Sequence, residues 1–170
     1  MPNSKTIKKQ DIASHLALWA SEYHFKDASE AVLNEAKRCL IDATGAALAG
    51  SQHPITRLLA KHIQKNYNNG ECNLLGLNPK ISPIGAALFN GTCSHVLDFD
   101  DVSFEGMVHA TAVVWPAVLA AAQSQQTSGE DALAAFVAGV EIEYALGRAF
   151  THDLFWRGWW TTGLLGVFGA

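Results

Sequence analysis

The chain from residue 90 to residue 101 reads Asn90-Gly91-Thr92-Cys93-Ser94-His95-Val96-Leu97-Asp98-Phe99-Asp100-Asp101, and His109 follows eight residues later. This stretch and His109 place three carboxylates and two imidazoles within twenty residues, between flanking segments that are rich in Ala, Val and Leu. Flanking segments of that composition pack in a protein core. Ionisable groups at this density beside a core indicate either a functional site or a structural ion-pair network.

The spacing of the ionisable residues suggests how they are arranged. His95 and Asp98 are three positions apart and would share one face of a helix. The consecutive carboxylates Asp100 and Asp101 indicate a loop that leads to His109. A His beside a carboxylate can be held in one tautomer and can act as a general acid or base near neutral pH. The alternative is that the two Asp residues cap a helix or turn and that His95 is a hydrogen-bonded core histidine.

Apolar residues recur at helical spacing along almost the whole chain, which predicts an all-α fold in one domain. The predicted helices cover residues 12–23, 33–47, 55–63, 82–98, 113–123 and 128–144. Ser82 followed by Pro83 is a typical helix start, with Ser as the cap and Pro in the first turn. Ser128 resembles the start of a capping box. Pro116 is expected in the first turn of its helix.

Composition excludes several classes of protein. The chain has 170 residues, 49% of them hydrophobic, and a net charge of −4. Its longest apolar run, residues 110–122, is too short to span a bilayer, and residues 1–10 lack the apolar core of a signal peptide. We therefore expect a cytoplasmic protein without a membrane segment. The acidic balance disfavours nucleic-acid binding, and three cysteines without a CxxC pair disfavour a disulfide framework or a zinc module.

A metal site is not predicted. Glu141 and Glu143 interrupt an apolar run, and carboxylates together with His95, His109 or His152 could in principle bind a divalent cation. No segment has a ligand spacing such as HExxH. The sequence therefore predicts no bound metal.

The quoted stretch closely resembles the signature of the MmgE/PrpD family, whose members include 2-methylcitrate dehydratases and cis-aconitate decarboxylases. Asn-Gly-Thr, a His, Leu-Asp-Phe-Asp-Asp and a further His occur in that order. Residues 40–50, 136–148 and 158–170 also look like family sequence. The resemblance implies a helical domain over residues 11–170, preceded by a polar tail over residues 1–10.

For this family, the resemblance implies cofactor-independent removal of water or CO₂ from citrate-like acids. Dehydration requires a base that takes the proton next to a carboxylate and an acid that protonates the departing hydroxyl. His109 matches the family's active-site His and is the expected acid or base. Asp98 matches the acidic residue of the same pocket and is expected to orient His109 or to contact the substrate. The further candidates for substrate binding are Asp101, His95, Arg157 and Trp160.

Three positions depart from the family pattern. Trp160 stands where the family's second active-site His follows a Gly-aromatic pair, and an indole cannot exchange protons at neutral pH. Val102 replaces the Thr that usually follows Phe-Asp-Asp, and Ala110 replaces the Pro that usually follows the active-site His. These departures predict that the substrate has changed or that the catalytic activity has been lost.

Lysine and arginine are unevenly distributed along the sequence. Between Lys80 and Arg148 the sequence contains no lysine or arginine, whereas a site for a di- or tricarboxylate needs cationic groups. Arg148 and Arg157 are the nearest candidates, and each could equally be a solvated residue near a helix end. Together with the apolar ending and the greater length of family members, this pattern predicts the amino-terminal part of a longer protein, without the family's α/β lid domain.

Two interpretations of function follow. The first is a divergent MmgE/PrpD-type lyase that acts on a small polycarboxylate by metal-free acid–base catalysis, and the resemblance adds that family members are commonly homodimers. The second is a non-catalytic helical remnant that binds a partner.

Overall fold

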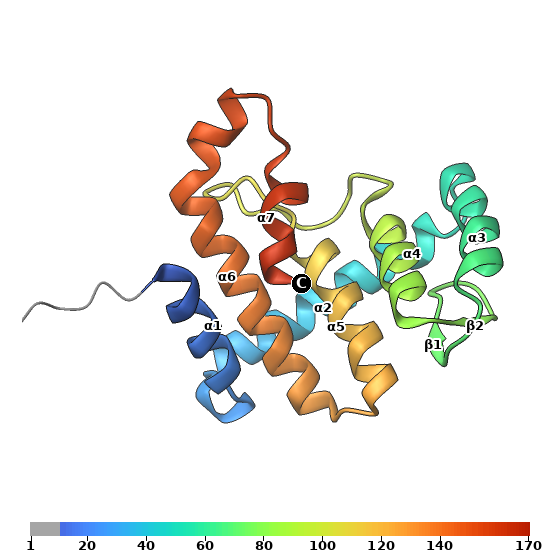
Figure 1. Ribbon diagram of the computed structural model, residues 1–170, viewed down its shortest axis with the longest axis horizontal. Coiled ribbons are helices and arrows are strands. Elements are labelled where there is room, and N and C mark those ends of the chain that lie inside the picture. Colours follow the sequence, from blue (N-terminus) through green and yellow to red (C-terminus); the bar gives the residue numbers. More distant parts are fainter. Residues whose placement is uncertain (1–10) are drawn as a thin grey trace, which may run out of the picture.

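The computed structural model describes residues 11–170, so the polar tail predicted at residues 1–10 lies outside the described residues. The described chain contains seven α-helices, one short 3-10 helix and a two-stranded antiparallel ribbon (Figure 1). This mostly helical architecture confirms the predicted fold class. Among the described residues, none of the helices has the length and hydropathy needed to cross a membrane.

The elements follow one another with short connections, except for the loop that precedes α5. In chain order they are α1 (Ile12–Glu22), η1 (Phe25–Asp27), α2 (Glu30–Gly50), α3 (Pro54–Asn66), β1 (Cys72–Asn73), β2 (Lys80–Ile81), α4 (Pro83–His95), α5 (Ala110–Gln125), α6 (Gly129–Trp156) and α7 (Thr161–Gly169). In the ribbon, Cys72 pairs with Ile81 and Asn73 pairs with Lys80.

Serine caps begin three of the helices. The side chains of Ser29, Ser82 and Ser128 each accept a hydrogen bond from a backbone N–H in the first turn of α2, α4 and α6. Each cap satisfies one of the N–H groups that a helix start leaves without an intrahelical partner. The helix starts predicted at Ser82 and Ser128 are thereby confirmed.

The predicted helix over residues 82–98 is wrong at its end. α4 ends at His95, and the chain turns so that the N–H of Asp98 donates to the carbonyl oxygen of His95 at 2.8 Å. Asp98 has a φ of 49°, in the left-handed region that Asp adopts more readily than most residues. His95 and Asp98 therefore do not share a helix face.

The predicted start of the following helix is also wrong. α5 begins at Ala110, with His109 as its N-cap residue, so Pro116 lies inside the helix rather than in its first turn. A proline inside a helix leaves one carbonyl without its usual N–H donor. Here that carbonyl belongs to Ala112, and α4 approaches it closely, because a Cβ added to Gly91 would lie 3.3 Å from the Ala112 oxygen.

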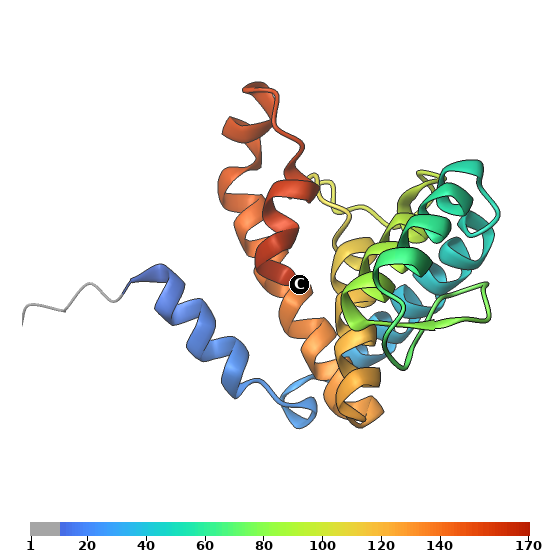
Figure 2. The same ribbon diagram turned by 45° about the vertical axis from the view of Figure 1, so that its right-hand side comes forward.

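The core consists of two apolar clusters joined by α2 and α5. One cluster lies among α2, α3, α4, α5 and the ribbon, and its buried members are Ala47, Ala60, Ile63, Cys72, Leu74, Ile81, Ala86, Phe89, Cys93 and Ala120. The other lies among α2, α5 and α6, and its buried members are Ala36, Val114, Leu133, Phe136 and Val137. Figure 2 shows α6 and α7 on one side of α5, and α3, α4 and the ribbon on the other. Each large buried side chain contributes about 1.5–3 kcal/mol.

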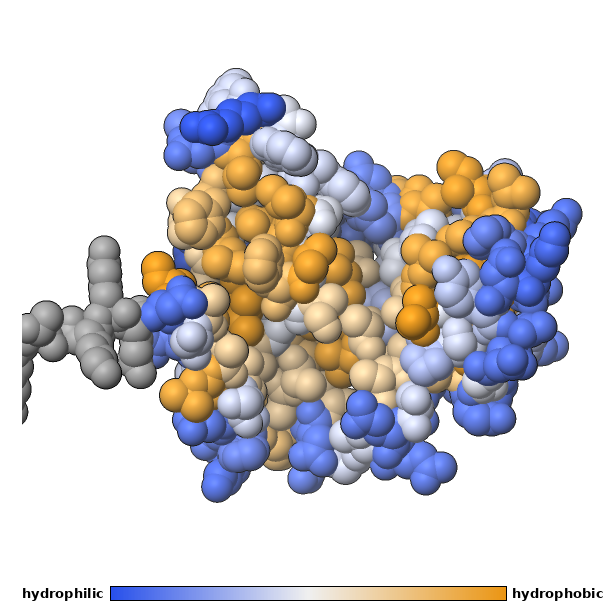
Figure 3. All heavy atoms as spheres, viewed as in Figure 1, coloured by the Kyte–Doolittle hydropathy of each residue, from blue (hydrophilic) through white to orange (hydrophobic). Residues whose placement is uncertain are grey.

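An apolar surface covers part of α6 and α7. Figure 3 shows apolar side chains gathered over these two helices on the face in view. On α7, Leu164, Val167 and Phe168 are exposed, with 74% of the surface of Val167 accessible to solvent. Contiguous apolar surface of this kind is typical of a protein interface.

Candidate functional site

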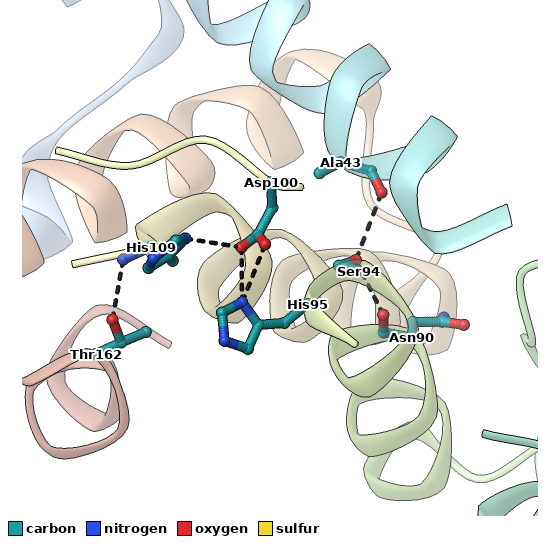
Figure 4. Close-up of polar contacts among 7 residues, drawn as sticks. All are labelled: Ala43, Asn90, Ser94, His95, Asp100, His109 and Thr162. Carbon is teal, nitrogen blue, oxygen red and sulfur yellow. Dashed lines mark hydrogen bonds and ion pairs between the residues drawn. The ribbon is translucent and has the colours of Figure 1, made fainter. Parts of the chain in front are cut away.

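The last turn of α4 positions His95. Asn90 is buried, and its Nδ2 donates to the carbonyl oxygen of Asn73 at 3.0 Å, which ties α4 to the ribbon. Ser94 is buried beside it, and its Oγ donates to the Asn90 carbonyl oxygen at 2.9 Å and reaches the Ala43 carbonyl oxygen of α2 at 3.5 Å (Figure 4). These contacts fix the end of α4 relative to α2 and therefore fix the position from which His95 projects.

The loop over residues 96–109 carries the other ionisable residues. Its start and end both contain a non-glycine residue in the left-handed region, Asp98 at a φ of 49° and Met107 at 47°. The N–H of Ser103 donates to the carbonyl oxygen of Val108 at 3.0 Å, and these two residues form an isolated antiparallel bridge within the loop. Left-handed conformations in non-glycine residues persist where surrounding structure holds them, often at functional sites.

α6 supports the middle of this loop. A Cβ added to Gly147 would lie 2.9 Å from the Cα of Gly106, so the absence of a side chain on Gly147 allows the two backbones to touch. Thr151 of the same helix donates its Oγ1 hydrogen bond to the Gly106 carbonyl oxygen. The loop is therefore packed against a rigid element.

α7 holds the end of the loop. The Oγ1 of Thr161 donates to the carbonyl oxygen of Met107 at 2.6 Å, and the Oγ1 of Thr162 accepts from the N–H of His109 at 3.0 Å. His109 is thus held at the junction of the loop, α5 and α7.

The Asp100 carboxylate bridges the two imidazoles. The Nδ1 of His95 lies 3.0 Å from both Asp100 carboxylate oxygens, and the Nδ1 of His109 lies 3.1 Å from Oδ2 (Figure 4). The Asp100 side chain is 0% exposed, whereas those of His95 and His109 are 29% and 20% exposed. Because a carboxylate only accepts hydrogen bonds, each Nδ1 carries a proton, and the Nε2 of each ring remains for another partner.

Asp98 lies at the edge of the same cluster. One ligand-type atom from each of His95, Asp98, Asp100 and His109 lies within 4.8 Å of the others. The structure therefore brings His95, Asp98 and His109 together, but the carboxylate that hydrogen-bonds to both rings is Asp100. Sequence reasoning considered Asp100 only as a capping or loop residue. Helical spacing does not identify Asp100, because the helix ends at His95 and Asp98 then takes a left-handed conformation, with a φ of 49°.

Asp101 belongs to a different environment. Its Oδ2 accepts from the Thr111 Oγ1 at 2.6 Å, and it lines a cavity with Cys39, Phe136 and Tyr144. Burial raises the pKa of the Asp101 carboxyl, and the hydrogen bonds from Thr111 and Cys39 oppose that rise. The structure places Asp101 against α2, α5 and α6 rather than against the two imidazoles.

Trp160 stands between two cavities that adjoin the imidazoles. A cavity of about 390 Å³ includes His95, Thr92 and Val113, and a second of about 580 Å³ includes His109 and Phe104; Trp160 lines both. The indole stacks on the His95 ring, with centroids 5.5 Å apart and planes at 28°. Most of the other lining residues are apolar.

Arg157, the remaining candidate from the sequence, lies outside these cavities. Arg157 is the C-cap residue of α6, is exposed and lines neither cavity. Among the residues that the structure describes, neither cavity has a lysine or arginine in its lining. The substrate-binding role of Arg157 stays a prediction.

Glu143 is a buried carboxylate away from the imidazoles. Its side chain is 0% exposed, and neither oxygen has a hydrogen-bond partner within residues 11–170. Burial, with a smaller repulsion from Asp101, raises the pKa of Glu143 to about 7. Neither Glu143 nor Glu141 joins the group formed by His95, Asp98, Asp100 and His109.

Comparison of the sequence with known proteins identifies its family. Residues 14–170 match the MmgE/PrpD N-terminal domain. The chain is 32% identical over 157 residues to the cis-aconitate decarboxylase-like protein oryM of Aspergillus oryzae, an alignment that covers 88% of this chain and 33% of that protein. It is 29% identical over 157 residues to the cis-aconitate decarboxylase of Aspergillus terreus, covering 89% of this chain and 32% of that protein.

A more distant relative shows the same likeness. The cis-aconitate decarboxylase of Homo sapiens is 28% identical over 121 residues, which cover 68% of this chain and 25% of the human protein. The chain spans about a third of the length of the Aspergillus relatives that it matches. Since the family match extends over nearly all described residues, the chain belongs to the MmgE/PrpD family.

Proposed function

We propose that this chain supplies the acid–base part of a lyase site that acts on a small citrate-like polycarboxylate. The observation that carries the proposal is the Asp100 bridge between His95 and His109, which holds both rings by Nδ1. Each ring keeps an Nε2 that can exchange a proton with a ligand, and each ring lines a cavity. Asp100 acts as a positioning residue, and His109 is the proposed acid or base.

The departure at Trp160 favours decarboxylation over dehydration. Dehydration needs two proton transfers, one from carbon to a base and one from an acid to the leaving hydroxyl. Decarboxylation needs one, because the electron pair of the breaking C–C bond passes to the neighbouring carbon, CO₂ departs, and an imidazolium then protonates that carbon. A site in which Trp160 takes the place of the family's second histidine still has enough proton-transfer groups for decarboxylation. The names of the relatives, cis-aconitate decarboxylases, support the same choice.

The proposal extends to location and assembly. We infer a cytoplasmic homodimer, as expected from the sequence and the family resemblance, that binds neither nucleic acid nor membrane. The exposed apolar side chains of α7, Leu164, Val167 and Phe168, support self-association.

A second candidate is a non-catalytic binding protein. Trp160 favours it, because the indole replaces a proton-transfer group and stacks on His95, where it limits access to that ring. The absence of lysine and arginine from both cavity linings in the described part of the chain also favours it.

The two candidates differ in ligand binding at the imidazoles. We would record nitrogen-15 NMR spectra of the histidine rings and of the Trp160 indole during titration with cis-aconitate, citrate and 2-methylcitrate. The lyase proposal expects shifts at His95, His109 and Trp160 that disappear in His109→Gln. His62→Gln is the matched control, because His62 is an exposed histidine of α3 that hydrogen-bonds only to Asn66 among the described residues. If none of the three acids shifts these signals, the lyase proposal is wrong and the binding protein is favoured.

A further inference from the structure

We propose that the cavity beside His109 holds the alkyl tail of its ligand, so that the site takes an alkyl-substituted dicarboxylic acid in preference to citrate itself. The inference rests on the proposed lyase function, in which His109 is the acid or base, and it names the class of substrate. The observation that carries it is the lining of this cavity of about 580 Å³. Its apolar side chains are those of Val102, Phe104, Met107, Phe155, Trp159 and Trp160.

The polar groups of the cavity are few and mostly occupied. The Oγ1 of Thr161 donates to the carbonyl oxygen of Met107 at 2.6 Å, and the Oγ1 of Thr162 accepts from the N–H of His109 at 3.0 Å. Among the described residues that line the cavity there is no lysine, arginine, aspartate or glutamate. A tricarboxylate that filled it would lose hydration without gaining a cationic partner. An alkyl tail would instead gain from burial.

Backbone contacts hold both segments that form the apolar wall. Phe104 lies within the loop segment that is closed by the bridge between Ser103 and Val108. At the end of α6, Gly158 has a φ of 83°, which glycine adopts without strain, and the next N–H donates back to a carbonyl oxygen of α6 at 3.1 Å. This turn brings Phe155 and the segment after α6 to the same cavity.

The exposure of the wall also indicates an apolar ligand. Phe104 is 88% exposed and Trp159 is 56% exposed, and contiguous apolar surface marks a ligand groove or an interface. A ligand is favoured here because the His109 imidazole lies in the same cavity and can contact a carboxylate head group. Pockets for drug-sized ligands measure about 300–1,000 Å³, so the cavity has room for a tail beyond a citrate-sized head group.

Phe150 provides a matched control for Phe155. Both are phenylalanines of α6 with similar exposure, 51% for Phe150 and 45% for Phe155. Phe155 lines the cavity beside His109, whereas Phe150 lines neither of the cavities that adjoin the imidazoles. Phe150→Ala therefore removes the same side chain from the same helix outside the proposed tail site.

The test is binding of acids with increasing tail length to the purified 170-residue chain. Succinate, butylsuccinate and octylsuccinate would be titrated by calorimetry, and nitrogen-15 NMR signals of the Trp159 and Trp160 indoles would locate the tail. We expect one ligand per chain and an affinity that rises about fourfold for each buried methylene.

Three variants separate the tail from the head group. Phe155→Ala should weaken octylsuccinate binding by at least about tenfold and leave succinate binding unchanged, whereas Phe150→Ala should change neither. His109→Gln should weaken all three acids by the same factor and preserve the rise with tail length. Circular dichroism checks that each variant keeps its fold.

Three outcomes would overturn the tail site. These are equal affinity for succinate and octylsuccinate, a tail effect that Phe150→Ala reduces as much as Phe155→Ala does, and a lower mass of Phe155→Ala in light scattering without any tail effect. The third outcome would make the aromatic wall an interface between copies of the chain.

The tail site and the lyase proposal can fail separately. A tail effect that depends on Phe155, with no weakening by His109→Gln, supports the tail site and contradicts the role of His109. Succinate binding that depends on His109, with no tail effect, supports the role of His109 and contradicts the tail site.

Discussion

Asp100 and Asp101 are consecutive residues whose carboxylates bond to different parts of the fold. Asp100 accepts hydrogen bonds from the two imidazoles, at 3.0 and 3.1 Å, whereas Asp101 accepts from the Thr111 hydroxyl at 2.6 Å. One short segment of the loop therefore contributes to the histidine cluster through Asp100 and fastens the loop to α5 through Asp101.

The first prediction concerns the bridging carboxylate. Asp100→Asn keeps the shape of the side chain but replaces one oxygen by an amide nitrogen, which cannot accept a hydrogen bond from an imidazole N–H. One histidine must then change its tautomer or lose its partner. We expect a loss of about 1.5–3 kcal/mol in the free energy of unfolding, measured in urea, and loss of one Nδ1–H signal in nitrogen-15 NMR spectra.

Asp42→Asn serves as the control for this substitution. Asp42 is an exposed aspartate of α2, and changing it is expected to alter the unfolding free energy by less than about 0.5 kcal/mol. Equal effects at the two positions would show that the Asp100 bridge contributes nothing specific.

The second prediction concerns pH dependence through Glu143. Burial raises the pKa of Glu143 to about 7, above its ordinary value of 4.5. Between these two values the folded chain holds a proton that the unfolded chain has released, so stability is full below the lower value and falls as the pH rises to the upper one. Glu143→Gln removes this titration. We expect the variant to be more stable than the parent by about 3 kcal/mol at a pH of about 8.

Thermal melts across the pH range check this prediction, and the difference between variant and parent isolates Glu143 from the other titrating groups. The stabilisation by Glu143→Gln should shrink as the pH falls and should be small at a pH of about 4. A difference that does not change with pH would contradict the proposed titration.

The third prediction compares two glycines. Gly147→Ala introduces a Cβ only 2.9 Å from the Gly106 backbone, and we expect it to lower the unfolding free energy by about 1–3 kcal/mol and to displace the loop that carries His109. Gly45 of α2 is exposed and would place its Cβ in open space. Gly45→Ala should therefore raise stability by about 0.5–1 kcal/mol, because alanine favours helix more than glycine does. Urea unfolding measures both, and two changes of the same sign would contradict the packing described.

The helices could be predicted from the sequence because their signals are local. Apolar spacing and the caps at Ser82 and Ser128 depend on residues within one or two turns, and the corresponding helix starts are where the pattern placed them. The end of α4 could not be predicted, because it depends on Asp98 adopting a left-handed conformation in a loop that α6 and α7 hold in place. The N-cap of α5 at His109 is fixed by the same tertiary contacts.

Part of the site could also be predicted, because its signal is the local order of residues in the sequence. His95, Asp98 and His109 could be selected because they stand in a recognisable order, and the fold brings them together. The role of Asp100 could not be inferred from helical spacing, because it lies five residues after His95 and nine before His109, across a helix end and a loop. The position of Asp101 against Thr111 likewise depends on how the loop meets α5.

The fourth prediction concerns assembly. The exposed apolar residues of α7, Leu164, Val167 and Phe168, form a surface that would gain from burial, and we expect the chain to self-associate. Light scattering at micromolar concentration should give a mass above that of one chain. Val167→Glu should shift the distribution toward the monomer, whereas Ile55→Glu, at an exposed apolar position of α3, should not. A parent chain that is monomeric would contradict the prediction.

The last prediction is that these 170 residues alone do not turn over a citrate-type acid. Trp160 occupies the position where the family resemblance expects a second proton-transfer group, and a well-placed acid or base accounts for about 10²- to 10⁴-fold in rate. The described cavity linings contain no lysine or arginine to stabilise the carboxylates, which costs about a further 10²- to 10³-fold. The purified chain would be assayed with 2-methylcitrate, citrate and cis-aconitate, alongside His109→Ala. Turnover that disappears in the variant would show that His109 and its neighbours suffice for catalysis, and that the losses assigned to Trp160 and to the missing cations are compensated within this chain.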